Sequence, residues 1–172
     1  MDNRTIILWV MIITIFGGCA SVNVFIPPWR KPGEKLLDPP EKIYREYNCQ
    51  NEEMPFIIVE HNELRPRRLM LQKGKKLNHR LIYGLCSDNY NDKIVGQLYT
   101  RITHRGKNVV TDVDETYTLK PGRWLVDTFI TLLENLDAGV YTLEIEFYNP
   151  KVDFKVENTF IVEPNDVVEG VK

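Results

Sequence analysis

Residues 139–147 constrain the fold more than any other stretch, because apolar and polar side chains alternate without a break from Tyr141 to Phe147. The run Gly-Val-Tyr-Thr-Leu-Glu-Ile-Glu-Phe places Tyr141, Leu143, Ile145 and Phe147 on one face and polar residues on the other. A period of two residues is that of a β-strand with one buried and one solvated face. Such strands are typical of antiparallel sheets, since buried parallel strands are apolar on both faces.

The same pattern recurs along most of the chain. Turn residues divide it into short segments with no convincing helical period. Seven or so short antiparallel strands at this spacing predict an all-β sandwich. The predicted strands lie within residues 56–60, 68–72, 77–86, 94–104, 109–113, 124–132, 139–147 and 152–162.

The later strands resemble those of bacterial immunoglobulin-like domains. The resemblance rests on Leu119-Lys-Pro-Gly-Arg-Trp124, on Leu136-Asp-Ala-Gly-Val-Tyr141-Thr-Leu-Glu-Ile and on Phe160-Ile-Val, within residues 95–163. In that fold a Gly-x-Tyr often opens the penultimate strand, and the tyrosine hydroxyl closes a corner onto nearby backbone. The resemblance implies an immunoglobulin-like antiparallel β-sandwich with Tyr141 at this corner. It implies no activity, because function on this fold depends on its loops.

The first nineteen residues resemble the lipobox signal of bacterial lipoproteins. A polar start with Arg4 precedes an apolar run over residues 5–16, which is shorter than the roughly 20 residues of an unassisted membrane-spanning helix. Small residues then lead to a cysteine in Phe16-Gly17-Gly18-Cys19, although leucine is commoner than phenylalanine at the first position. The resemblance implies that residues 1–18 are removed and that Cys19 is diacylated. An uncleaved anchor and an ordinary secretory signal are the alternatives.

Residues 19–55 are rich in proline and predict an extended, lipid-anchored leader. Proline lacks a backbone donor and fixes φ, which disfavours helices and central strands. Apolar residues in the same stretch indicate that part of it packs on the domain, with residues 43–47 as a short helix or strand. The expected remainder is a β-sandwich domain over residues 56–164 and a flexible tail over residues 165–172.

The three cysteines divide into one with a lipid role and one pair. If Cys19 carries lipid, Cys49 and Cys86 remain in a compartment that tolerates disulfides. A bridge between them would stabilise the fold by about 3 to 4 kcal/mol on chain-entropy estimates. The alternative is two small buried apolar side chains that do not meet.

A cluster of cations between residues 65 and 80 is the most suggestive feature of the mature chain. It suits anionic lipid headgroups, lipopolysaccharide phosphates or an acidic glycan, and the alternative is a set of outward strand positions around a turn. Tyr90, Tyr99 and Trp29 are the aromatic residues suited to sugars, whereas we expect Trp124 in the core. The candidate anion-binding residues are Arg65, Arg67, Arg68, Lys73, Lys75, Lys76 and Arg80.

Recognisable catalytic and metal-binding motifs are absent from the sequence, including nucleophile elbows, zinc-protease helices, Cys-x-x-Cys pairs and phosphate loops. The histidines are widely spaced, and one acidic cluster fits no known calcium loop. We expect these side chains, and a pair of outward glutamates, to be ordinary strand or turn residues. They are His61, His79, His104, Asp112, Asp114, Glu115, Glu144 and Glu146.

The formal net charge of −2 argues against a dedicated nucleic-acid binder. The sequence therefore predicts a non-enzymatic cell-envelope lipoprotein, without cofactor or metal, whose sandwich is an interaction or assembly module for an envelope protein. The alternative is a ligand-binding module for a glycan or an anionic lipid headgroup. Ala20 follows the lipid-attachment cysteine in place of an acidic residue, which favours the outer membrane with the domain facing the periplasm.

Overall fold

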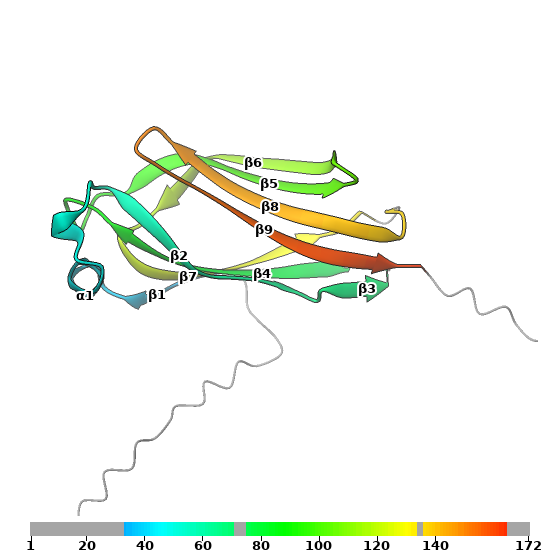
Figure 1. Ribbon diagram of the computed structural model, residues 1–172, viewed down its shortest axis with the longest axis horizontal. Helices are drawn as coiled ribbons and strands as arrows, with labels where there is room; N and C mark the ends of the chain where they lie inside the picture. Colours follow the sequence, from blue (N-terminus) through cyan, green and yellow to red (C-terminus); the bar gives the residue numbers. More distant parts are fainter. Residues whose placement is uncertain (1–32, 71–74, 134–135, 165–172) are drawn as a thin grey trace, which may run out of the picture.

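The computed structural model of the protein describes residues 33–70, 75–133 and 136–164 (Figure 1). The expected signal (1–18), the lipid-attachment residue Cys19 and the expected tail (165–172) lie outside these ranges. The described elements are β1 (Gly33–Asp38), α1 (Pro40–Glu46), the 3-10 helix η1 (Cys49–Asn51), β2 (Phe56–Arg65), β3 (Arg68–Met70), β4 (Lys76–Cys86), β5 (Ile94–His104), β6 (Lys107–Leu119), β7 (Gly122–Thr131), β8 (Gly139–Asn149) and β9 (Val152–Glu163).

The strands form two facing sheets, so the predicted all-β sandwich is confirmed. One sheet has the order β1-β7-β4-β2 and the other has the order β3-β9-β8-β5-β6 (Figure 1). Every described strand pair is antiparallel except β3 with β9, which is parallel. The described residues contain nine strands rather than seven or so, in part because the leader contributes β1.

The strand order is that of an immunoglobulin-like fold. β2, β4 and β7 take the places of strands A, B and E, while β5, β6, β8 and β9 take those of C, C′, F and G. β1 fills the position beside strand E that strand D holds in that fold. The N-terminal segment thus extends this sheet by pairing with β7, a strand that comes much later in the chain.

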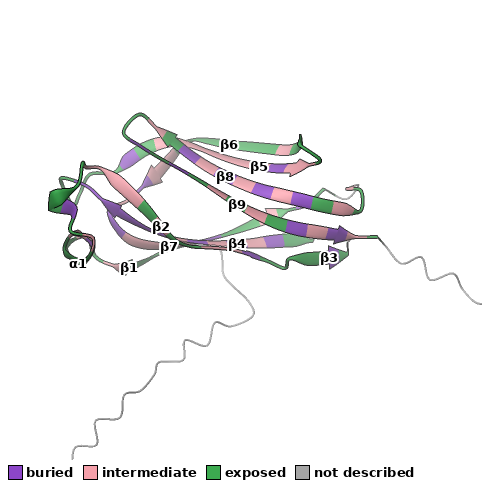
Figure 2. Cartoon of the chain, viewed as in Figure 1, coloured by how far each residue is buried: buried purple, intermediate pink, exposed green. Residues whose placement is uncertain are grey.

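The alternation along the strands fills the space between the sheets (Figure 2). Tyr141, Leu143, Ile145 and Phe147 are all buried, as the pattern of β8 predicts, and the predicted inward face of β4 is buried as well. Burial of apolar surface, at about 25 cal/mol per Å², is the main favourable term in folding. The core therefore gives a rigid frame that fixes the loops at each end.

Tyr141 closes the corner between β7 and β8, as the resemblance implied. Its side chain is buried, and its hydroxyl donates a hydrogen bond of 2.8 Å to the carbonyl oxygen of Asp137. Desolvation raises the pKa of Tyr141, so the hydroxyl remains a donor at neutral pH. The ring also stacks on His104 and Phe160, with centroid distances of 4.3 and 5.4 Å, and so contacts both neighbouring strands.

The domain begins earlier than the expected residue 56, because much of the predicted tether is folded. β1 pairs with β7 along its whole length, and Ile43 of α1 is fully buried. The prolines flank these elements instead of interrupting them. Pro39 precedes α1 and Pro40 occupies its first position, where a missing N–H leaves no helical hydrogen bond unmade. The segment expected as a short helix or strand is helical up to Glu46.

A disulfide joins Cys49 and Cys86, whose Cα atoms lie 6.0 Å apart. Both side chains are buried with Ile43 in a small apolar cluster, separate from the main core. The bridge fastens α1 and η1 to the end of β4 across a sequence separation of 37. Tyr47 lies against Gly84, where an added Cβ would come within 2.5 Å of the ring, so glycine permits this close packing.

Candidate functional site

One end of the sandwich carries most of the predicted anion-binding residues. The β2–β3 connection, the start of β4, the β5–β6 hairpin and the end of β9 form this end, at the right of Figure 1. The hairpin brings two cations that lie far from the predicted stretch in the sequence. We call this surface the basic end; its described cations, all exposed, are Arg65, Arg67, Arg68, Lys75, Lys76, Arg105 and Lys107.

Few of these cations have a carboxylate partner. Arg65 lies 2.5 Å from Glu63, and Arg68 lies 3.8 Å from Glu163. Among the residues that the structure describes, the other five form no ion pair: Arg67, Lys75, Lys76, Arg105 and Lys107. Their charge is therefore available to an external anion.

Arg80 was predicted as part of the anion-binding set but does not belong to the basic end. It forms two hydrogen bonds with Asp127 of β7, at 2.8 and 2.6 Å, and the two side chains are only 12% and 5% exposed. These hydrogen bonds raise the pKa of Arg80. Arg80 therefore ties β4 to β7 instead of facing a ligand, and Lys73 lies outside the described residues.

A groove of about 480 Å³ lies at the opposite end of the sandwich, near α1. Trp124 packs on the core, as expected, but also lines this groove. Its indole N–H donates to the carbonyl oxygen of Pro121 at 2.9 Å, and Lys120 Nζ lies 4.8 Å from the ring centre. Tyr90 is 39% exposed and meets Tyr44 edge to face at 5.8 Å. The other lining residues are Leu36, Pro40, Glu41, Asn91, Lys93, Lys120 and Pro121.

The two remaining aromatic candidates do not join the groove. Tyr99 lies on the outer face of the five-stranded sheet, where the Arg101 guanidinium stands 4.6 Å from its ring centre and its hydroxyl donates to Gln97 at 2.6 Å. Trp29 lies outside the described residues.

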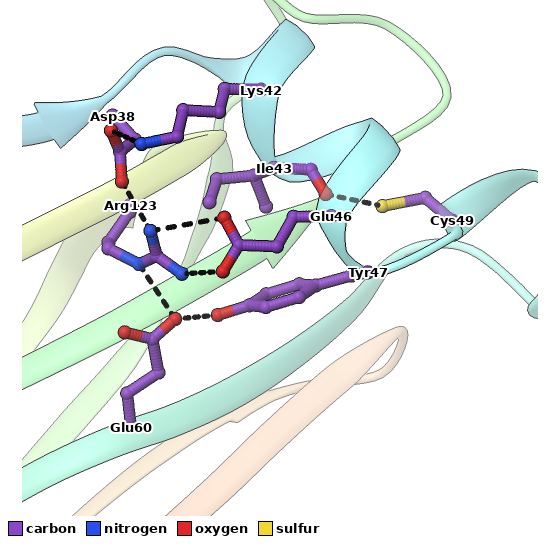
Figure 3. Close-up of polar contacts among 8 residues, drawn as sticks. All are labelled: Asp38, Lys42, Ile43, Glu46, Tyr47, Cys49, Glu60 and Arg123. Atoms are coloured by element: carbon purple, nitrogen blue, oxygen red, sulfur yellow. Dashed lines mark hydrogen bonds and ion pairs between the residues drawn. The ribbon is translucent and has the colours of Figure 1, made fainter.

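Arg123 organises the polar contacts beside the groove (Figure 3). Its guanidinium binds Asp38 of β1, Glu46 of α1 at 2.5 Å and Glu60 of β2 at 2.8 Å. The hydrogen bond with Glu46, followed by those with Glu60 and Asp38, raises the pKa of Arg123. Tyr47 also donates its hydroxyl hydrogen bond to Glu60. No sequence pattern predicts this network, because its members are spread widely along the chain.

The histidines lie on strands and contact neighbouring residues of the sandwich. His79 is buried, with Nε2 at 2.8 Å from Asn62 Oδ1, and His104 places Nδ1 at 2.8 Å from the carbonyl oxygen of Val140. His61 lies 3.5 Å from Glu63. Within the described ranges no three His, Cys, Asp or Glu side chains converge to hold a metal ion.

The acidic side chains also have local roles. Asp112, Asp114 and Glu115 are exposed along β6, at the edge of its sheet, where charged side chains discourage pairing with another chain. Glu144 and Glu146 face outward, as expected. Both also hold Arg101, at 2.5 and 2.6 Å, so they stabilise the sheet in addition to keeping it soluble.

Comparison with known proteins identifies no family. No family model matches the chain, and none of the curated proteins matches it. One similar solved structure belongs to a protein assigned to the late embryogenesis abundant (LEA) proteins. It is 11% identical, with a TM-score of 0.39, over 72% of this chain and 79% of that chain. At this identity and TM-score, the likeness carries no argument about function. None of the helices in the described ranges is long and apolar enough to cross a membrane.

Proposed function

We propose that the protein is a non-enzymatic, lipid-anchored component of the cell envelope whose sandwich binds an envelope protein. The observation that carries the proposal is the apolar segment followed by Phe16-Gly17-Gly18-Cys19. With residues 1–18 removed and Cys19 diacylated, the mature chain would be held at the outer membrane with its domain in the periplasm. Only residues 20–32 would then separate the lipid from the first strand.

The outer face of the five-stranded sheet is the surface best suited to a protein partner. Val95 on β5 is 54% exposed and Tyr148 on β8 is 55% exposed. The two lie close together, because Asn149 donates from its side chain to the carbonyl oxygen of Val95 at 2.9 Å. Tyr99 and Arg101 continue the same face. Exposed aromatic residues and arginine are enriched in protein interfaces and often contribute most of the binding energy.

Photo-crosslinking in intact cells tests this surface. A photoreactive residue at position 148 should give a discrete adduct with an envelope protein, and Val95→Asp should remove that adduct. The matched control places the same group at Lys35, which is exposed on β1 in the opposite sheet. If position 148 gives no adduct, or the same adducts as position 35, the partner surface is wrong.

A glycan-binding role is the second candidate, and the groove at the α1 end favours it. Trp124 and Tyr90 provide aromatic walls, while Asn91, Glu41 and Lys93 supply polar groups. Sites of this size, mostly apolar with a few polar groups, commonly hold small ligands. Calorimetric titration with soluble cell-wall glycan fragments should show binding that Tyr90→Ala weakens at least about tenfold and that Tyr99→Ala, on the other face, leaves unchanged. Equal binding by all three proteins would exclude the groove.

A further inference from the structure

We propose that the basic end docks on an anionic lipid surface, so that the sandwich rests on the membrane beside its own anchor. This proposal goes beyond the binding of a protein partner, because it assigns a second surface and a different class of ligand. The contacts are made by side chains of the folded domain and do not require lipid at Cys19, whereas the placement beside the anchor rests on the proposed function.

Unpaired charge distinguishes the basic end from the body of the sandwich. Five of its cations form no ion pair within the described residues, whereas most of the described cations elsewhere are engaged by carboxylates. Each lysine or arginine near an anionic membrane contributes about 1 kcal/mol, which is roughly a fivefold gain in binding. The engaged cations are Lys42, Arg80, Arg101, Lys120, Arg123 and Lys155.

The opposite end of the molecule carries the opposite charge. Its loops, η1 and the β8–β9 turn present more exposed carboxylates than cations. An anionic surface would therefore attract the basic end and repel the other, which fixes the orientation of the long axis. With α1 included, the exposed charges there are Glu41, Glu46, Glu52, Glu53, Asp88, Asp92 and Asp153 against Lys42, Arg45, Lys93 and Lys151.

Exposed apolar side chains at the basic end favour a lipid surface over a soluble polyanion. Met70 on β3 is 45% exposed, and Leu133 beyond β7 is 46% exposed. Both lie among the cations: Met70 is two residues from Arg68, and the backbone N–H of the neighbouring Leu132 donates to the carbonyl oxygen of Lys75 at 3.1 Å. Apolar side chains ringed by Lys and Arg are typical of surfaces that enter the headgroup region. An acidic glycan offers no apolar phase to receive them.

The length of the leader allows this contact. β1 begins at Gly33, so about 13 residues after Cys19 reach at most about 45 Å when fully extended. The domain would therefore stay close to the bilayer, where a weak electrostatic contact is strengthened by the high effective concentration that a tether provides.

Vesicle binding by the full chain tests the proposal. Partition coefficients are measured on two kinds of vesicle, one with about 30% phosphatidylglycerol in phosphatidylcholine and one of phosphatidylcholine alone. The measured quantity is the ratio of the first coefficient to the second. The apolar segment at residues 5–16 contributes equally to both coefficients and so cancels in the ratio. Arg67→Glu, Lys75→Glu and Lys107→Glu combined should lower this ratio on the order of a hundredfold. The matched control combines Lys35→Glu, Lys93→Glu and Lys151→Glu, with the same change in net charge, and should change the ratio only a fewfold. Thermal melting checks that both variants fold.

A second pair of substitutions separates a membrane from other polyanions. Met70→Ser with Leu133→Ser should weaken binding to anionic vesicles about tenfold, while binding to dextran sulfate stays unchanged. The proposal is overturned if the basic-end variant keeps the wild-type ratio, if the control variant loses as much, or if only dextran sulfate binding responds to the charge reversals. None of these results bears on anchoring at Cys19, which is measured separately.

Discussion

Tyr141 and Arg123 each fix part of the fold through a single polar group, Tyr141 by a bond to Asp137 four residues earlier and Arg123 by bonds to segments far apart in the sequence. The Tyr141 hydroxyl fixes the β7–β8 corner, and the Arg123 guanidinium gathers carboxylates from β1, α1 and β2. Hydrogen bonds between neutral groups contribute about 1 kcal/mol each, whereas removing one partner from a shielded charged network costs more. The two residues should therefore differ in their effects on stability.

Replacing Tyr141 with phenylalanine removes only the corner hydrogen bond and keeps the stacked ring. We expect the free energy of unfolding, measured by chemical denaturation, to fall by about 1 kcal/mol. Tyr99→Phe is the matched control, because its hydroxyl bonds to Gln97 on the outer face of the sheet. An unchanged midpoint for Tyr141→Phe, or an equal loss in both variants, would show that the corner bond does not stabilise the fold.

Arg123→Met should be more damaging, because three carboxylates lose a common partner while a side chain of similar length remains. The Arg123 side chain is 15% exposed, so solvent screens the pairs only partly, and we expect a loss of about 2 kcal/mol. Lys42→Met removes a pair whose lysine is 54% exposed and should cost less than about 1 kcal/mol. Denaturation curves with the order reversed would contradict this account of the network.

The leader elements depend on their attachments more than on their own sequence. β1 is exposed along nearly all of its length, and α1 has only seven residues. An isolated helix of that length is unstable in water, and β1 has one strand neighbour. The disulfide and the Arg123 network therefore hold this part of the domain in place.

Removing the disulfide tests that dependence. Cys49→Ser with Cys86→Ser should lower the free energy of unfolding by about 3 to 4 kcal/mol on the chain-entropy model, and backbone hydrogen exchange should accelerate first in α1 and η1. Cys19→Ser, which leaves the bridge intact, is the control for the loss of a cysteine. Unchanged protection in α1 after removal of the bridge would mean that the helix is held by other contacts.

Sequence patterns predicted the strands that bury one face. They did not predict a strand such as β1, whose formation does not depend on the burial of apolar side chains. β8 alternates strictly from Tyr141 to Phe147, and inward residues recur at every second position of β4 from Leu77 to Leu85, so the core residues of both strands could be assigned residue by residue. β1 has no such alternation, because it joins the sheet through backbone hydrogen bonds to the open edge of β7. The prolines of the leader suggested a tether, although Pro39 and Pro40 mark the start of α1.

The sequence also predicted only those parts of the candidate surfaces whose residues are close together along the chain. The basic stretch could be recognised because five of its members are close together in the sequence. Arg105 and Lys107 lie at the basic end only because the β5–β6 hairpin turns there. Arg80 is excluded from the basic end because it pairs with Asp127 of β7. The pairing of Trp124 with Tyr90 in one groove likewise depends on how the two sheets and their loops meet.

Acid should destabilise the whole domain through two carboxyls. The hydrogen bond from Lys42 is the main cause that lowers the pKa of Asp38, and the hydrogen bond from Lys155 is the main cause that lowers that of Glu144. A carboxyl with a lowered folded-state pKa contributes stability above its ordinary value, here 3.8 and 4.5. That contribution is lost as the pH falls through the folded-state pKa, because protonation breaks the interaction.

We therefore expect the Tm to be steady from about pH 7 to pH 5 and to fall progressively below that range. Asp38→Asn with Glu144→Gln should start from a lower Tm at neutral pH and decline less steeply on acidification. Thermal melts across the series provide the measurement. Parallel declines in the two proteins would assign the acid sensitivity to other groups.

Anchoring at Cys19 is the central claim at the scale of the molecule, and metabolic labelling with palmitate followed by membrane fractionation measures it most directly. The wild-type chain should incorporate label and sediment with membranes. Cys19→Ala should incorporate none, and it should either leave the membrane fraction or accumulate with residues 1–18 still attached. An unlabelled wild-type protein, or a Cys19→Ala protein that is processed normally and retained on membranes at the wild-type level, would contradict the claim.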